Sequence, residues 1–231
     1  MNHSLQTVSY DHADGGTAVQ RNRVLRNTYW LLALSMLPTV LGAWIGIATG
    51  IASSMSSGIG AIVFIGGAFA FMFAIEKTKN SAAGVPLLLA FTFFMGVMLS
   101  RMVGMVLGLS NGAGLVMMAF AGTGAIFLGM ATLSSIIKRD LTAMGKWLFI
   151  GAIMLLVAGI ANLFIQSSAL MITMAVLAIG IFSAFILHDL KRVQDGLETN
   201  YISATLGVYL SIYNVFQSLL MLLGIFGGRD E

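Results

Sequence analysis

Residues 169–187 read ALMITMAVLAIGIFSAFIL, a run without a charged side chain that ends where His188 and Asp189 begin. A helix needs about 20 mostly apolar residues to cross the hydrocarbon core of a bilayer. Six comparable runs lie at 28–50, 58–75, 82–108, 113–137, 145–165 and 201–226. We therefore predict an all-α, polytopic membrane protein with seven transmembrane helices.

The composition agrees with a chain that lies mostly in lipid. Hydrophobic residues make up 58% of it and charged residues 9%, against roughly 25% charged residues in soluble domains. We expect a polar N-terminal segment at 1–27 and a transmembrane domain at 28–231. Since the net charge is only +3 and the basic residues lie beside the spans, we expect the lipid bilayer as a partner and no nucleic acid.

Lysine and arginine are distributed unevenly around the predicted spans. Ten of the twelve lie in the N-terminal segment or in and directly beside the gaps between spans 2 and 3, 4 and 5, and 6 and 7. Cytoplasmic loops of membrane proteins are enriched in these residues, which predicts a cytoplasmic N-terminus and an external C-terminus. An even number of spans would place Arg229 with the other cations, but the seven apolar runs favour an odd number.

Arg101 is the one charged residue well inside a predicted span. It lies about twenty residues into that span, near the external surface, where a long side chain can reach water. The alternative is that it faces an internal cavity, as intramembrane charges often do.

Small residues at intervals of four predict close helix packing within the bundle, or self-association as the alternative; they are Gly42, Gly46 and Gly50, and Gly104, Gly108 and Gly112.

The last predicted span has a polar face. A 4-4-3-4 spacing places its members on one side of a helix; they are Ser203, Gly207, Ser211, Asn214 and Ser218, beside a strip of Tyr209, Tyr213 and Gln217. This face either makes interhelical hydrogen bonds or lines a central, partly hydrated cavity.

Two ionisable residues end the sixth span. Asp189 is either an interfacial charge paired with a nearby cation or a carboxylate that faces the polar side of the last span. Histidine is the residue type that changes charge near neutral pH, so His188 is a candidate pH sensor.

No motif for catalysis, for a cofactor or for a metal is present in the sequence. Two of the three histidines lie in the polar N-terminal segment, and there is no phosphate-binding loop, nucleophile elbow or HExxH. The absence of cysteine excludes thiol catalysis and thiolate metal sites. We predict no enzymatic activity, and a small-molecule transporter is a weak alternative because no inverted repeat is visible.

Two stretches resemble a known family. VLRNTYWLL at 24–32 and ETNYISATLGVYLSIYNVFQSLLMLLG at 198–224 resemble the YccA-like branch of the Bax inhibitor-1 (TMBIM) family, and the similarity runs from about Asn22 to the end of the chain. The resemblance implies six helices around a short, central seventh helix, and residence in the bacterial inner membrane.

The resemblance implies two activities. YccA-like members modulate the membrane-anchored AAA protease FtsH, which makes an FtsH-type protease the expected partner; the N-terminal segment suits presentation to it, unless that segment is a terminus without a partner. Other members form a pH-gated leak for calcium, controlled by two facing carboxylates. Asp189 occupies the first of these positions, but Ser211 replaces the second. A lone carboxylate cannot share a proton as a close pair does, and a hydroxyl is a poor ligand for a hard dication. A calcium or other cation leak is therefore the alternative function.

Overall fold

A computed structural model describes residues 11–227, with side chains described from residue 18 onward. Every regular element in that range is a helix, and the eight helices are α1 (Asp11–Thr49), α2 (Ile51–Ser54), α3 (Ser57–Thr78), α4 (Gly84–Leu107), α5 (Gly112–Ile136), α6 (Thr142–Ile165), α7 (Ser168–Gln194) and α8 (Tyr201–Gly227). Seven of them are long and apolar enough to cross a membrane, all except α2. The predicted fold class and number of spans are confirmed.

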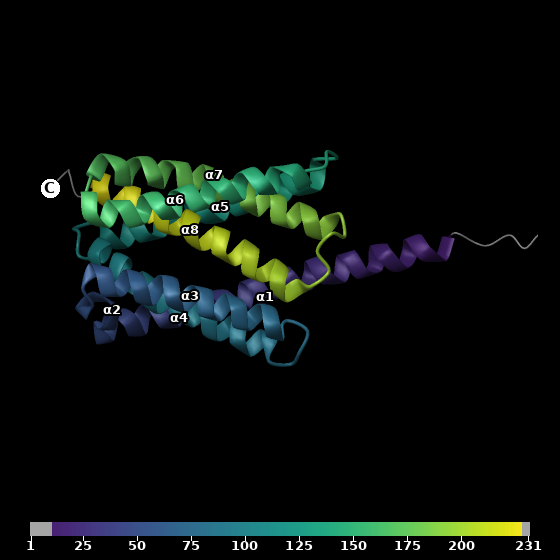
Figure 1. Cartoon of the computed structure of the whole chain (residues 1–231), viewed down its shortest axis with the longest axis horizontal. Helices are drawn as coiled ribbons and strands as arrows, with labels where there is room; N and C mark the ends of the chain where they lie inside the picture. Colours follow the sequence, from purple (N-terminus) through teal and green to yellow (C-terminus); the bar gives the residue numbers. More distant parts are fainter. Residues whose placement is uncertain (1–10, 228–231) are drawn as a thin grey trace, which may run out of the picture.

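The final helix is central. α8 runs between a group formed by α1, α3 and α4 and a group formed by α5, α6 and α7 (Figure 1), and it contacts α1, α4, α5 and α7. By contrast, α3 packs mainly on α4, and α6 packs mainly on α7. The expected central position is therefore confirmed, whereas the expected short length is wrong, because α8 has 27 residues, as many as α7.

Two helices extend further than hydropathy predicts. α1 begins at Asp11, within the polar segment expected at 1–27. Residues 20–26 are mostly good helix formers and contain neither glycine nor proline. α7 continues past 187 to Gln194, because Leu190 and Val193 are fully buried and keep the apolar face at helical spacing. In both helices, charged residues bound the apolar run, but the helix itself continues beyond them.

The closest helix contact in the bundle joins α1 to α4. A Cβ atom added at Gly42 would lie 2.2 Å from the carbonyl oxygen of Phe93, and one added at Gly96 would lie 2.1 Å from that of Thr39. Only glycine lets two helix backbones approach this closely. Packing within the bundle is thus confirmed at Gly42, and also at Gly46, where an added Cβ would lie 2.4 Å from Ser100 Oγ.

The other glycines of the two predicted runs have different places. Gly50 has a left-handed φ of 66° and begins the turn into α2. Gly108 caps the C-terminus of α4 and Gly112 begins α5, where an added Cβ would lie 2.2 Å from the carbonyl oxygen of Val106. Gly104 has only one neighbouring atom within 4 Å, at 3.9 Å on Ile47. Gly108 and Gly112 therefore belong to a tight helix–helix turn and Gly104 makes no close helix contact, so the expected role of this run in close helix packing is wrong.

The basic links gather at one end of the bundle, which we call the cationic end. Asn200 Nδ2 donates to the carbonyl oxygen of Lys79 (3.2 Å), Gln194 Nε2 donates to Ser134 Oγ (2.9 Å), and Arg21 Nη1 donates to the carbonyl oxygen of Gln194 (3.4 Å). These bonds connect the N-terminal part of α1 with the links that follow α3, α5 and α7. α2 and the end of α8 lie at the opposite end (Figure 1).

Candidate functional site

His188 and Asp189 lie on α7 near the cationic end and face two different helices. His188 Nδ1 is 3.1 Å from Asp189 Oδ1, and the buried imidazole packs against Gly145 at the start of α6, where an added Cβ would lie 2.7 Å from Nε2. Asp189 Oδ2 lies 2.8 Å from the position of a Cβ at Gly207. The absence of a side chain at Gly207 thus provides space for this carboxylate against α8.

Ser211 lies one helical turn after Gly207 and is buried. Its hydroxyl donates to the carbonyl oxygen of Gly207 at 3.1 Å. α8 carries no acidic residue between Tyr201 and Gly227, so no second carboxylate faces Asp189 from this helix. The geometry therefore places Asp189 beside the polar face of α8 but does not provide a carboxylate pair.

The polar face of α8 bonds mostly to its own backbone. Asn214 Nδ2 donates to the carbonyl oxygen of Leu210 at 2.8 Å, as Ser211 does to Gly207. Ser218 is buried, and the buried Ser203 Oγ has no hydrogen-bond partner among the described residues. Short polar side chains in a helix reach the carbonyl four residues earlier, and for this reason the expected interhelical bonds of Ser211 and Asn214 are wrong.

The adjoining tyrosine strip connects α8 to other helices by hydrogen bonds, as Thr205 Oγ1 does through the carbonyl oxygen of Thr28 in α1 at 3.4 Å. The Tyr209 hydroxyl lies 2.9 Å from Thr39 Oγ1 of α1 and 3.4 Å from the carbonyl oxygen of Thr92 in α4. The Tyr213 hydroxyl donates to the carbonyl oxygen of Met95 at 3.4 Å. Both rings are buried, so this strip connects the central helix to the α1–α4 pair. The spacing of four between the two tyrosines was the signal for this contact.

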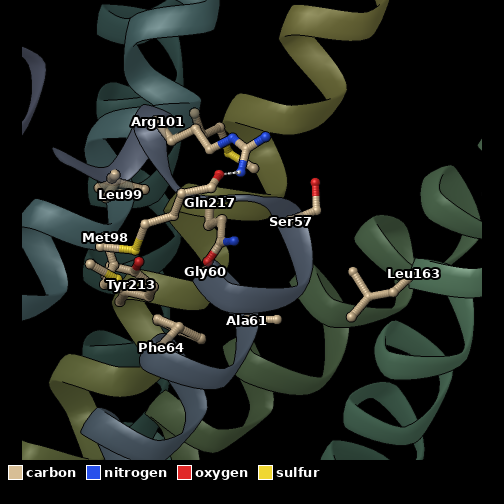
Figure 2. A pocket seen from close by; sticks show the side chains of 13 residues that line it. Ser57, Gly60, Ala61, Phe64, Met98, Leu99, Arg101, Leu163, Tyr213 and Gln217 are labelled. Carbon is tan, nitrogen blue, oxygen red and sulfur yellow. Dashed lines mark hydrogen bonds between the residues drawn. The ribbon is translucent and has the colours of Figure 1, made fainter. Parts of the chain in front are cut away.

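Arg101 faces a cavity. It is half-buried near the end of α4, and its Nη1 donates to the carbonyl oxygen of Met55 at 3.3 Å. It lines a cavity of about 290 Å³ together with Gln217 and Tyr213 of α8 and with Leu163 of α6 (Figure 2). Of the two interpretations of Arg101, the structure favours the one in which it faces a cavity.

Metal binding has no support in the geometry. Within the described residues, no group of three or more histidine, aspartate or glutamate side chains is arranged to hold a metal ion. His188 and Asp189 are neighbours without a third ligand of these types.

These features define a class of protein: an integral membrane protein of seven membrane-length helices built around its buried final helix. Residues 21–228 match the family described as "Inhibitor of apoptosis-promoting Bax1". The chain therefore belongs to the Bax inhibitor-1 family, as its sequence resemblance predicts.

Full-length bacterial relatives share this similarity. An uncharacterised protein of Neisseria meningitidis serogroup A is 37% identical over 229 residues, which cover 98% of this chain and 100% of the relative. An uncharacterised membrane protein of Vibrio cholerae is 36% identical, with coverage of 92% and 93%. A protein of Escherichia coli K12 named "Modulator of FtsH protease YccA" is 34% identical over 223 residues, 96% of this chain and 98% of the relative.

Proposed function

We propose that this chain is an inner-membrane protein that modulates proteolysis by a membrane-anchored AAA protease of the FtsH type. The observation that carries the proposal is the 34% identity to the Escherichia coli modulator of FtsH protease. The alignment covers 96% of this chain and 98% of the relative, so the similarity is not confined to one part of either sequence. A further relative from Escherichia coli O6:H1, also 34% identical, is named an inner membrane protein.

The cationic end of the bundle supports a cytoplasmic N-terminus. The last turns of α3 and α7 and the links that follow α3 and α5 carry basic residues: Lys77 and Lys79, Lys138 and Arg139, and Lys191 and Arg192. Hydrogen bonds hold this end of the bundle together beside α1. Clusters of lysine and arginine near span ends orient a membrane protein with that end in the cytoplasm. An odd number of spans then places the C-terminus outside.

The N-terminal part of α1 is the candidate contact with the protease. α1 continues past the bundle at its cationic end (Figure 1). The buried Val24 packs with Val193 and Ala204, and Arg21 donates to Gln194; these contacts hold α1 to the ends of α7 and α8. Residues 11–20 of α1 therefore extend from a fixed point toward the compartment in which we place the protease.

The fold supports occupancy of the protease rather than rapid degradation of the chain. A protease that engaged the N-terminal segment would have to extract seven apolar helices from lipid, against the preference of about 20 apolar residues per span for the hydrocarbon core. The chain would thus hold the protease and reduce the access of other membrane substrates. This mechanism requires both the segment at 1–27 and the intact bundle.

Co-purification tests the proposal. The full-length chain, a variant lacking residues 2–20 and a variant in which residues 2–20 are replaced by glycine and serine are extracted in mild detergent, and the co-purifying protease is measured. We expect the protease to co-purify with the full-length chain only. Both variants retain the residues from Arg21 onward that hold α1 to α7 and α8, so loss of the protease would be due to residues 2–20. Absence of the protease from the full-length sample, or equal amounts with all three, would contradict the proposal.

A further inference from the structure

The cavity beside Arg101 lies between the two halves of the bundle. α3 and α4 line one side, α6 contributes Leu163 from the other side, and Tyr213 and Gln217 of α8 lie between them (Figure 2). Ala52 and Met55, from α2 and the residue that follows it, contribute at the end opposite the cationic end. The cavity is thus separate from His188 and Asp189.

The cavity contains one cationic side chain whose charge is not balanced by protein. A guanidinium has five N–H donors, and Arg101 uses one for the carbonyl oxygen of Met55. None of the ion pairs found among the described residues involves Arg101. Of the charged residues between 18 and 227, it alone lies toward the end of the bundle opposite the cationic end. An unpaired charge at the membrane is costly, so an anion would be stabilised here.

A second polar group lies next to Arg101. Gln217 belongs to the same cavity, with its side chain below the guanidinium (Figure 2). Its amide makes no hydrogen bond to other described residues and therefore has two N–H donors available for a ligand. A guanidinium and an amide together present several donors in one direction, which suits the oxygens of a phosphate.

The rest of the cavity is apolar. Phe64 of α3, Met98 of α4 and Leu163 of α6 form walls that offer no hydrogen bond to a ligand. Methionine adapts its shape to irregular apolar groups. Ile62 and Phe164, which follow the lining residues Ala61 and Leu163 in the sequence, are exposed large apolar side chains, which suits a surface in contact with lipid. These walls suit an alkyl chain better than a hydrated ion.

We propose that this cavity binds an anionic phospholipid, with the phosphate against Arg101 and Gln217 and the first part of one acyl chain against Phe64, Met98 and Leu163. A volume of about 290 Å³ is at the lower limit for small-molecule pockets, so the rest of the lipid remains in the bilayer. Arg101 lies six residues before the end of α4 at Leu107, about 9 Å along the helix axis. This depth is close to the headgroup region.

Thermal unfolding of the delipidated full chain in neutral detergent tests the proposal. The chain is titrated with phosphatidylglycerol, with phosphatidylcholine of the same acyl chains, and with inorganic phosphate. We expect a saturable rise of the unfolding temperature with phosphatidylglycerol only. Arg101→Gln should weaken the apparent affinity for phosphatidylglycerol roughly tenfold or more, as expected for loss of a hydrogen bond to a charged group. Arg139→Gln, an exposed arginine at the cationic end, should leave the affinity unchanged.

A second pair of variants tests the cavity without changing the charge. Leu163→Trp fills the cavity and should also weaken the affinity for phosphatidylglycerol, whereas Leu156→Trp should not. Both leucines lie on α6 and are 40% exposed, but only Leu163 lines the cavity. If Arg101→Gln fails to fold, the comparison of these two tryptophan variants still tests whether the cavity binds the phospholipid. Equal effects of the two phospholipids, a full effect of inorganic phosphate alone, or equal affinities for the two tryptophan variants would overturn the proposal.

Discussion

Gly96→Ala tests whether α1 and α4 are in backbone contact. The new methyl carbon would lie 2.1 Å from the carbonyl oxygen of Thr39, and ordinary contacts of this kind begin at 3.4 Å. The two helices would have to separate locally by up to 1.3 Å, the difference between these distances. The Thr39 oxygen belongs to the backbone of α1 and the new Cβ is fixed directly to the backbone of α4, so no flexible side chain can move aside.

The expected cost follows from this displacement. A gap of 0.5–1 Å already removes a quarter to a half of the dispersion attraction between atoms that were in contact, and overpacking in protein interiors costs about 1–3 kcal/mol. We expect Gly96→Ala to lower the free energy of unfolding by an amount in that range. Gly42→Ala should act in the same direction, because its Cβ would lie 2.2 Å from the carbonyl oxygen of Phe93.

The double variant adds a sharper test. Once one methyl group has separated the helices, the second fits at a lower cost, so the two changes should not be additive. Gly66→Ala on α3 is the matched control, because an added Cβ there meets no atom within 4 Å. It should be neutral or stabilising by up to about 1 kcal/mol, the usual gain when alanine replaces glycine in a helix.

The assay is unfolding of the purified chain in one detergent, followed by circular dichroism for the four variants and the parent chain. The expected order of stability places Gly66→Ala at or above the parent, and the two single variants at the contact below it. Equal stabilities of Gly96→Ala and Gly66→Ala would refute the close approach of α1 and α4.

Three further predictions concern other parts of the molecule. The Asp140 carboxylate accepts hydrogen bonds from the Thr142 hydroxyl and backbone N–H, which hold the pKa of that carboxyl below its usual value. The ionised Asp140 carboxylate therefore stabilises the fold above its unfolded-state pKa, and this stabilisation is lost as the pH falls below about 4. The stability of Asp140→Asn should fall less than that of the parent chain as the pH is lowered through this range. An equal fall in stability for the two proteins would contradict this. Ser211→Asp should create a carboxylate pair with Asp189 and give pH-dependent calcium flux in reconstituted vesicles; strong flux in the parent chain that Asp189→Asn leaves unchanged would disprove this logic. A reporter fused after Glu231 should be active only if it functions outside the cytoplasm, and activity of a cytoplasm-specific reporter would exclude the odd-span topology.

The helices that cross the membrane could be predicted from the sequence because hydropathy is a local property. A run such as 169–187 needs no knowledge of its neighbours to indicate a span. The ends of these helices could not be predicted in the same way. α7 continues to Gln194 because Leu190 and Val193 are buried by other elements, and burial depends on tertiary contacts that hydropathy does not record.

The candidate sites could likewise be predicted from the sequence only in part. The 4-4-3-4 spacing predicted that one side of α8 is polar, and the structure places Gly207 and Asp189 together there. The direction of the Ser211 hydrogen bond depends on a side-chain rotamer, which spacing does not determine. The cavity beside Arg101 could not be identified because it requires Leu163, 62 residues further along the chain. The sequence was compatible with Arg101 either reaching water at the membrane surface or facing an internal cavity, and it could not distinguish between the two.

The half-life of another membrane-embedded substrate of the protease tests the proposed function most directly. It is measured in cells without this chain, with the full-length chain, and with the variant lacking residues 2–20, at equal amounts of the two proteins in the membrane. The proposal predicts a longer half-life with the full-length chain and a return to the original value with the shortened variant. An unchanged half-life in the presence of the full-length chain would contradict it.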